Sequence, residues 1–291
     1  MGEKKNDKRS MAMLIASMTI WGTIGIFRRY IPLPSSVLAA TRGVIGTFSL
    51  LAFLKFRGRK LRFRMDGKLI VWYEVAGAIM AFNWVFLFEA YNYTSIAIAT
   101  LCYYMRPVFV TLASAVLFGE RLTARKLFCV VVCLFGMLLV TGVVGSSLPG
   151  PGETKGILLG LGAAVLYAAV VLMNKKVSGV DPFEKTIVQL LASSAALVPY
   201  LLLTVDPGTL QLSGIAVPML LVVGILHTGI PYALYFGCTD GLKAQTVAIF
   251  GYLDPIVAVL LSALLLGEPL TILSMIGVVL VIGGAIMSEL E

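Results

Sequence analysis

Long apolar segments, separated by short polar or basic ones, extend over almost the whole chain. A helix that rises 1.5 Å per residue needs about 20 apolar residues to cross a bilayer. The pattern predicts ten such helices, at residues 11–27, 36–54, 69–90, 95–118, 123–143, 156–174, 184–204, 215–238, 244–267 and 271–288. We therefore predict an all-α integral membrane protein with ten transmembrane helices.

One stretch of the chain occurs twice, 148 residues apart, and its matches include proline, glycine and glutamate. Tyr104, Pro107, Ser114, Gly119, Glu120, Leu122 and Thr123 match Tyr252, Pro255, Ser262, Gly267, Glu268, Leu270 and Thr271. Further matches, at offsets of 146 to 148, join Trp21 to Tyr167, Arg42 to Gln189, Trp84 to Tyr232 and Phe88 to Phe236. The repeat predicts two five-helix halves, 11–143 and 156–288, with an external linker at 144–155.

The composition supports a lipid environment. Hydrophobic residues make up 59% and charged residues 13% of the 291 positions, and the mean hydropathy is +0.95. Too few polar side chains remain to cover a water-facing surface. The four cysteines lie in apolar segments without histidine or acidic neighbours, which favours packing roles over metal binding.

The basic residues predict the orientation. With the amino terminus inside, eighteen of the 23 lysines and arginines lie on the inner side, seven of them between Lys55 and Lys68. The positive-inside rule then places both termini in the cytoplasm, in a cytoplasmic membrane. This distribution also explains the net charge of +8 without nucleic acid as a partner. Because five spans per half is an odd number, the second half is inverted, as in secondary transporters that bind substrate near the midplane.

Several segments resemble the EamA-type permeases of the drug/metabolite transporter superfamily. They are residues 101–109, 117–123, 250–257 and 265–271, together with Ile20-Trp21-Gly22, Arg42 and residues 90–95. The resemblance covers essentially the whole chain and implies alternating access around a cavity lined by helices 1, 3, 4, 6, 8 and 9. It also implies metabolite substrates, among which aromatic amino acids and sugars are known for the family. Arg106 and His227 depart from the usual family pattern.

Charges inside predicted spans are costly and indicate a cavity or a partner. Arg106 and Asp254 occupy the same repeat position, each directly before a proline. Pro107 and Pro255 remove the hydrogen bonds to the carbonyls of residues 103 and 251 and are expected to bend both helices. Arg106 and Asp254 either pair and lock the halves together, or face the cavity and bind a carboxylate or phosphate and an amine or proton.

Helical spacing adds further candidates to this central site. Tyr103 lies one turn before Arg106, Asn83 is the uncharged polar residue deep in the third span, and His227 lies one turn before the equivalent of Asn83. His227 is either a hydrogen-bonded packing residue or a substrate or proton ligand. The symmetric aromatics Trp21 and Tyr167 either pack between helices or line the cavity.

Arg42 lies about 9 Å from the outer end of the second span, and Glu89 lies near the outer end of the third. They are predicted to form an ion pair, and an outer gate is the alternative.

The function predicted from these features is secondary transport, by alternating access, of a small polar metabolite such as an amino acid or another carboxylate-bearing compound. Efflux is favoured only by the family resemblance, and protons and a homodimer are left open as partners. An alternative is a drug or organic-cation exporter in which Asp254 binds the cation or proton and Arg106 is its resting partner. The chain has one histidine and no motif of a metalloprotease, serine hydrolase or phosphate loop. We therefore predict no enzymatic activity, no metal and no cofactor.

Overall fold

The structure is a computed structural model that describes residues 2–24, 27, 30–56, 58, 60–61, 65–94, 99, 102–140, 153–177, 179–210, 214–238, 241–266 and 271–289. Every regular element in these ranges is a helix. The first half contains α1 (Gly2–Gly22), α3 (Ser35–Phe56), α4 (Gly67–Tyr93), α6 (Arg106–Phe118) and α7 (Ala124–Val140). The second contains α8 (Glu153–Lys176), α9 (Pro182–Thr204), η1 (Pro207–Thr209), α10 (Ala216–Gly224), η2 (Ile225–Gly229), α11 (Ile230–Cys238), α12 (Ala244–Phe250), α13 (Leu253–Leu266) and α14 (Ile272–Glu289).

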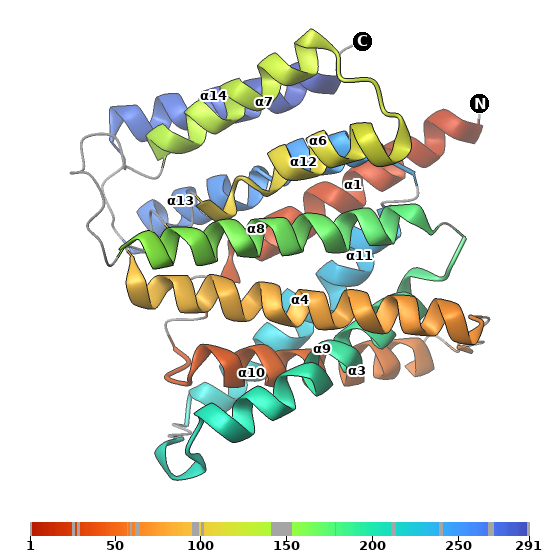
Figure 1. Ribbon diagram of the computed structural model, residues 1–291, viewed down its shortest axis with the longest axis vertical. Coiled ribbons are helices and arrows are strands. Elements are labelled where there is room, and N and C mark those ends of the chain that lie inside the picture. Colours follow the sequence, from red (N-terminus) through yellow and green to blue (C-terminus); the bar gives the residue numbers. More distant parts are fainter. Residues whose placement is uncertain are drawn as a thin grey trace.

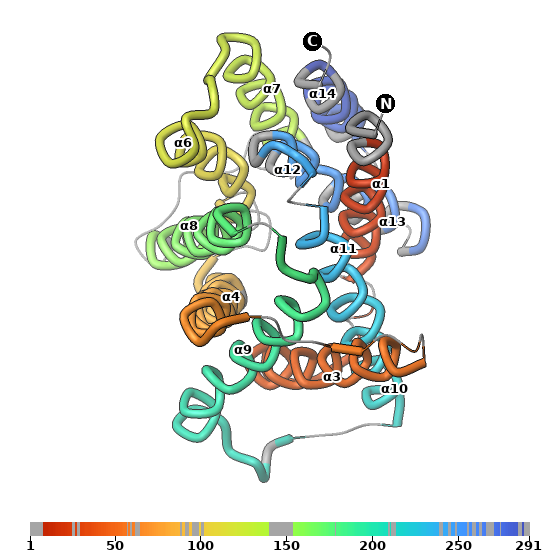
Figure 2. Tube along the Cα trace, turned by 90° about the vertical axis from the view of Figure 1, so that its right-hand side faces the viewer, coloured from red at the N-terminus to blue at the C-terminus, as the bar shows by residue number. Residues whose placement is uncertain are grey.

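These helices overlap the predicted spans, although residues 95–98 and 100–101 of the fourth predicted span lie outside the described residues. In Figure 1 they lie side by side across the view, with α7 and α14 at one edge of the bundle and α3, α9 and α10 at the other. The turned view in Figure 2 keeps the same order. Five of the helical stretches in the described ranges are long and apolar enough to cross a membrane by themselves. The predicted spans 215–238 and 244–267 are each divided, and most of the predicted linker 144–155 lies outside the described residues.

The two halves meet on a pseudo-two-fold axis. Three contacts join residues that are 148 positions apart, and a two-fold rotation brings a residue against its own equivalent only near the axis. The Trp84 indole N–H lies 3.2 Å from the Tyr232 hydroxyl. The Cys133 thiol lies 3.6 Å from the carbonyl of Val281, and the third contact, between Arg106 and Asp254, lies at the centre of the candidate site.

The packing of α7 against α14 confirms the inversion. A Cβ atom at Gly136 would lie 2.8 Å from the carbonyl oxygen of Gly277, and one at the equivalent Gly284 would lie 2.7 Å from the Cys133 sulfur. Partner numbers fall along α14 as they rise along α7, so these equivalent helices are antiparallel. Small residues permit this close approach of two helices within a membrane. The fold is therefore an all-α membrane protein of two inverted five-helix repeats.

The bends predicted at Pro107 and Pro255 take the form of breaks. Pro107 is the second residue of α6, after a turn at Tyr104 and Met105. Pro255 is the third residue of α13, after a turn that separates α13 from α12. Proline is well accommodated in the first turn of a helix, where no intrahelical partner is needed for the missing N–H. Each proline thus begins a helical segment inside the bundle, and the residue before it lies at a helix start.

Candidate functional site

A buried ion pair joins the two breaks. Arg106 is the first residue of α6, Asp254 is the second residue of α13, and they are only 4% and 9% exposed. Arg106 Nη2 lies 2.6 Å from Asp254 Oδ2. The same nitrogen donates to the carbonyl of Gly251 at 3.2 Å, which is the carbonyl that Pro255, with no N–H, cannot bond. The break at Pro255 in the second half therefore supplies two hydrogen-bond acceptors to the guanidinium of Arg106 in the first half.

Three tyrosine rings surround the guanidinium. The Cζ atom of Arg106 lies 4.7 Å from the ring centre of Tyr103, 5.0 Å from that of Tyr104 and 4.6 Å from that of Tyr167. Aromatic faces attract a cation at such distances, and more strongly where water is excluded. We call these three rings the cage. Tyr103 and Tyr167 were predicted from the sequence to line the site, and Tyr104 was not.

The ion pair does not use all of its hydrogen-bonding atoms. Arg106 Nε and Asp254 Oδ1 are both buried and make no close hydrogen bond within the described residues, although the Tyr104 hydroxyl also contributes a hydrogen bond to the Asp254 carboxylate. A buried donor or acceptor without a partner costs about 1–3 kcal/mol. One spare donor and one spare acceptor thus lie on neighbouring, oppositely charged groups.

Next to the cage is a small void of about 10 Å³, which has room for about one water molecule. It is lined by Met80, Asn83, Tyr167, Val170, Val171, Tyr232, Tyr235 and Phe236. The Tyr167 hydroxyl donates to the Tyr235 hydroxyl at 2.8 Å across it. Asn83 lines the void and also donates to the carbonyl of Ala163 on α8 at 2.6 Å. Within the described residues this void is too small for a metabolite, so a metabolite binds at this place only if the surrounding helices separate.

A second polar cluster, which we call the latch, joins α1 and α3 to η2. It consists of Trp21, Thr23, Arg42, His227 and Thr228. η2 is a π turn, in which the Ile230 N–H donates to the carbonyl of Ile225, five residues earlier. Because Pro231 has no N–H for the carbonyl of His227, that oxygen is available and accepts from the Trp21 indole at 3.1 Å.

The His227 ring lies between Thr23 and Phe27 in the latch. The Thr23 hydroxyl oxygen lies 2.7 Å from the carbonyl oxygen of Ile20 and 2.7 Å from His227 Nε2. Because a hydroxyl has one proton, it donates to one of these two partners, and the tautomer of the ring decides which. His227 Nδ1 is buried and has no hydrogen-bond partner among the described residues. Phe27 covers the ring, with centroids 4.7 Å apart. His227 and Trp21 therefore lie close together within the latch.

The position of Arg42 differs from the predicted ion pair. Its Nε donates to the Thr228 hydroxyl at 3.0 Å, and its guanidinium lies 4.6 Å from the ring centre of Trp84. Glu89 is not among these contacts. The Thr228 hydroxyl in turn donates to the carbonyl of Val223 at 2.9 Å. Arg42 therefore contacts α4 and η2 through a ring and a hydroxyl, because the π turn brings Thr228 within reach.

Sequence reasoning missed Tyr104, Tyr235, Thr23 and Thr228. Tyr104 adjoins the predicted Tyr103 and is a repeat match of Tyr252, and Thr228 adjoins His227, so the repeat and adjacency to a candidate were the available signals. At helical spacing, adjacent residues point in different directions, and only the turns at Tyr104 and η2 bring both members of each pair to the site. In the described part of the chain no group of three His, Cys, Asp or Glu side chains is placed to hold a metal ion.

Two inverted five-helix halves, with interrupted helices and a buried polar site between them, define a multi-pass membrane transporter. The model of the EamA-like transporter family matches residues 8–142 and again 154–290, so the chain belongs to that family.

Several of its relatives have transporter names. The chain is 28% identical over 280 residues to "Uncharacterized transporter YxxF" of Bacillus subtilis (strain 168), with 96% of this chain and 89% of the relative covered. It is 23% identical over 273 residues to "Protein RarD" of Salmonella typhi, covering 91% and 89%. A solved crystal structure superposes with a TM-score of 0.85 over 96% of each chain at 21% identity, which supports the fold alone.

Proposed function

We propose that this transporter carries a small zwitterionic metabolite, such as an amino acid with an apolar side chain, out of the cell by alternating access. The observation that carries the proposal is the Arg106–Asp254 pair with its spare donor and spare acceptor. A substrate carboxylate complements Arg106 Nε, and a substrate ammonium complements Asp254 Oδ1. A zwitterion therefore satisfies both buried atoms at once, whereas a simple anion or cation satisfies one.

The surrounding rings suit the rest of such a substrate. Tyr103, Tyr167 and Tyr235 supply apolar surface beside the charged pair, and Trp21 lies 5.2 Å from the Tyr235 ring, centre to centre. An apolar side group replaces water against these rings, while the Tyr167 and Tyr235 hydroxyls stay paired. In the proposed cycle the halves rock about the breaks at Pro107 and Pro255, and the latch closes one side of the path.

Direction and orientation are part of the proposal. The excess of lysine and arginine on one side supports a cytoplasmic membrane with both termini in the cytoplasm. A fluorescent protein that matures only in the cytoplasm, fused after Glu291, should be bright. A dark fusion with normal membrane insertion would reverse the assignment of sides.

A binding screen tests the substrate class. Purified protein is heated with amino acids, organic acids, nucleosides and organic cations, and ligands of the folded state raise the melting temperature. We expect stabilisation by zwitterions, which is lost in Arg106→Gln and in Asp254→Asn. Arg125→Gln, at an exposed arginine of α7, is the matched control that should behave as wild type. Stabilisation by anions alone, or unchanged zwitterion binding in Arg106→Gln, would contradict the proposal.

An organic-cation exporter is the second candidate, favoured by the cage itself. A carboxylate with three tyrosine rings is a common recognition site for a cation, and Arg106 then occupies the site until substrate displaces it. The two variants separate the candidates. For a cation substrate Asp254→Asn abolishes transport while Arg106→Gln keeps it, whereas for a zwitterion both variants abolish it.

A further inference from the structure

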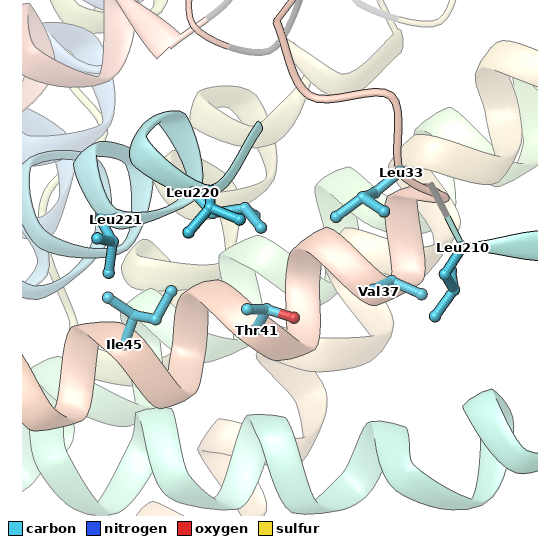
Figure 3. Close-up of a pocket in the computed structure, with 8 residues that line it drawn as sticks. Leu33, Val37, Thr41, Ile45, Leu210, Leu220 and Leu221 are labelled. Atoms are coloured by element: carbon cyan, nitrogen blue, oxygen red, sulfur yellow. The ribbon is translucent and has the colours of Figure 1, made fainter. Parts of the chain in front are cut away.

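A groove separates α3 from α10 at the end of the bundle where α3 begins. It has a volume of about 320 Å³ and is lined by Leu33, Val37, Thr41, Ile45, Leu210, Val217, Leu220 and Leu221. Seven of these eight residues are aliphatic. Figure 3 shows Val37, Thr41 and Ile45 one turn apart along one face of α3, with Leu220 and Leu221 opposite Ile45.

The groove faces the membrane. Both of its walls belong to helical stretches long and apolar enough to span a bilayer. Val217 and Leu221 are nearly half exposed, and apolar side chains exposed on a spanning helix contact acyl chains rather than water. A hydrocarbon chain of the surrounding lipid is therefore the occupant whose chemistry fits the groove.

The dimensions match one acyl chain in one leaflet. From the start of α3 at Ser35 to Ile45 the helix rises about 15 Å, which is half of a hydrocarbon core of about 30 Å. An apolar cavity of about 150 Å³ holds benzene, so this groove has room for roughly twice as many carbon atoms. The groove is thus long enough for a chain segment and too narrow for two chains side by side.

The groove lies next to the contact between α3 and the α10–η2 segment, and the same contact includes residues of the latch. A Cβ atom at Gly224 would lie 2.4 Å from the Cβ of Ile45, and one at Gly46 would lie 3.0 Å from Thr228 Cγ2. Ile45 lines the groove, while Thr228 bonds Arg42 one turn away. A chain that touches both walls gains its full apolar contact only while α3 and α10 keep this spacing.

We propose that the groove is a lipid site, in which one acyl chain of a membrane phospholipid binds between α3 and α10 and stabilises the closed latch. The site takes a saturated alkyl chain, and it does not depend on which substrate the central ion pair binds. Ordinary lipid contact, in contrast, is equal on all apolar faces and is not saturable.

The experiment uses the full chain purified in detergent, to which a phosphatidylcholine with a diazirine on its palmitoyl chain is added at increasing concentration. After illumination, mass spectrometry counts adducts per residue on segments 33–45 and 214–221. The reference is the exposed face of α9 around Val198 and Leu202. We expect about tenfold more adducts in the groove than on the α9 face, which corresponds to a binding free-energy difference of about 1.4 kcal/mol. The unlabelled lipid should compete with this labelling saturably. In detergent, the same lipid should raise the melting temperature saturably.

Groove-filling variants complete the test. Val37→Phe and Thr41→Phe should each reduce groove labelling to the level of the α9 face and remove the thermal shift, while Val198→Phe, the same change on an exposed face, should do neither. If Val37→Phe does not fold, Thr41→Phe alone carries the comparison. Equal labelling of both faces, labelling that cannot be competed, or unchanged labelling in the folded variants would overturn the proposal.

Discussion

α4 and the α10–η2–α11 segment are the third spans of the two halves, yet they are built differently. α4 is a continuous helix from Gly67 to Tyr93. Its equivalent consists of α10, the π turn η2 and α11. At the repeat offset of 148, Asn83 of α4 corresponds to Pro231 of α11. One substitution between the copies therefore coincides with the change from an intact helix to an interrupted one.

Both versions make the same kind of contact with the opposite half, with the chemical roles reversed. The side-chain amide of Asn83 donates to a backbone carbonyl of α8, that of Ala163. In the other half, a backbone carbonyl, that of His227, accepts from a side chain of α1, Trp21. α8 and α1 are themselves equivalent helices. At one of the two equivalent places the halves are joined by the side-chain amide of Asn83, and at the other by the carbonyl of His227, which Pro231 cannot bond. Only the second arrangement includes the latch.

The largest effect is expected where the halves touch at equivalent positions. Arg106→Asp or Asp254→Arg alone places like charges together in a buried site, and breaking such a pair costs about 3–5 kcal/mol. The double variant, which exchanges the two charges across the axis, should recover much of that stability. Melting temperatures in detergent measure both. A double variant as unstable as the single ones would show that the two positions are not interchangeable, despite their 2.6 Å contact.

Asn83→Pro imposes the proline of the second half on α4. A proline inside a helix costs about 3 kcal/mol or more, and this one also removes the bond to Ala163. The control Asn83→Ala removes only that bond, at about 1 kcal/mol. We expect the proline variant to melt well below the alanine variant. Equal melting temperatures would mean that α4 accepts a π turn as readily as its equivalent does.

The link between Pro231 and Trp21 is open to a double-mutant cycle. Pro231→Ala returns an N–H that bonds the His227 carbonyl, so the Trp21 indole loses its acceptor. Trp21→Phe should then cost about 1 kcal/mol in the wild type and less in the Pro231→Ala background. The free energy of unfolding of the four proteins gives the coupling. Additive effects would indicate that the carbonyl is not released by the proline.

The sequence was sufficient for the elements and for part of the site. Apolar length predicts the helices, because a bilayer sets that length, and the repeat predicts the equivalence of positions 106 and 254. The loss of the bond to the carbonyl of Gly251 also follows from Pro255 alone. The sequence left open whether Arg106 pairs with Asp254, since helical spacing gives a direction on one helix and not the distance to another.

The π turn and its consequences could not be predicted. Proline marks a weak point in a helix, but the choice between a bend, a break and a π turn depends on packing against α1 and α3. The predicted partner of Arg42 was Glu89, because charge complementarity is visible in a sequence. A hydroxyl brought into reach by one extra residue in a turn, as at Thr228, has no such signature.

The smallest effect is expected at Arg42, whose guanidinium makes two different contacts. Its Nε bonds Thr228 on η2, while its face lies over Trp84 on α4, so it joins the two unlike third spans directly. Arg42→Lys keeps the charge, but an ammonium on a flexible stem cannot both reach Thr228 and stack on the ring. We expect a loss of about 0.5–1 kcal/mol, and a larger loss in Arg42→Gln, which also removes the cation from Trp84. Unfolding of the purified variants measures both. If lysine were as disruptive as glutamine, the planar fork rather than the charge would hold α4 and η2 together, and the latch would depend on shape more than on electrostatics.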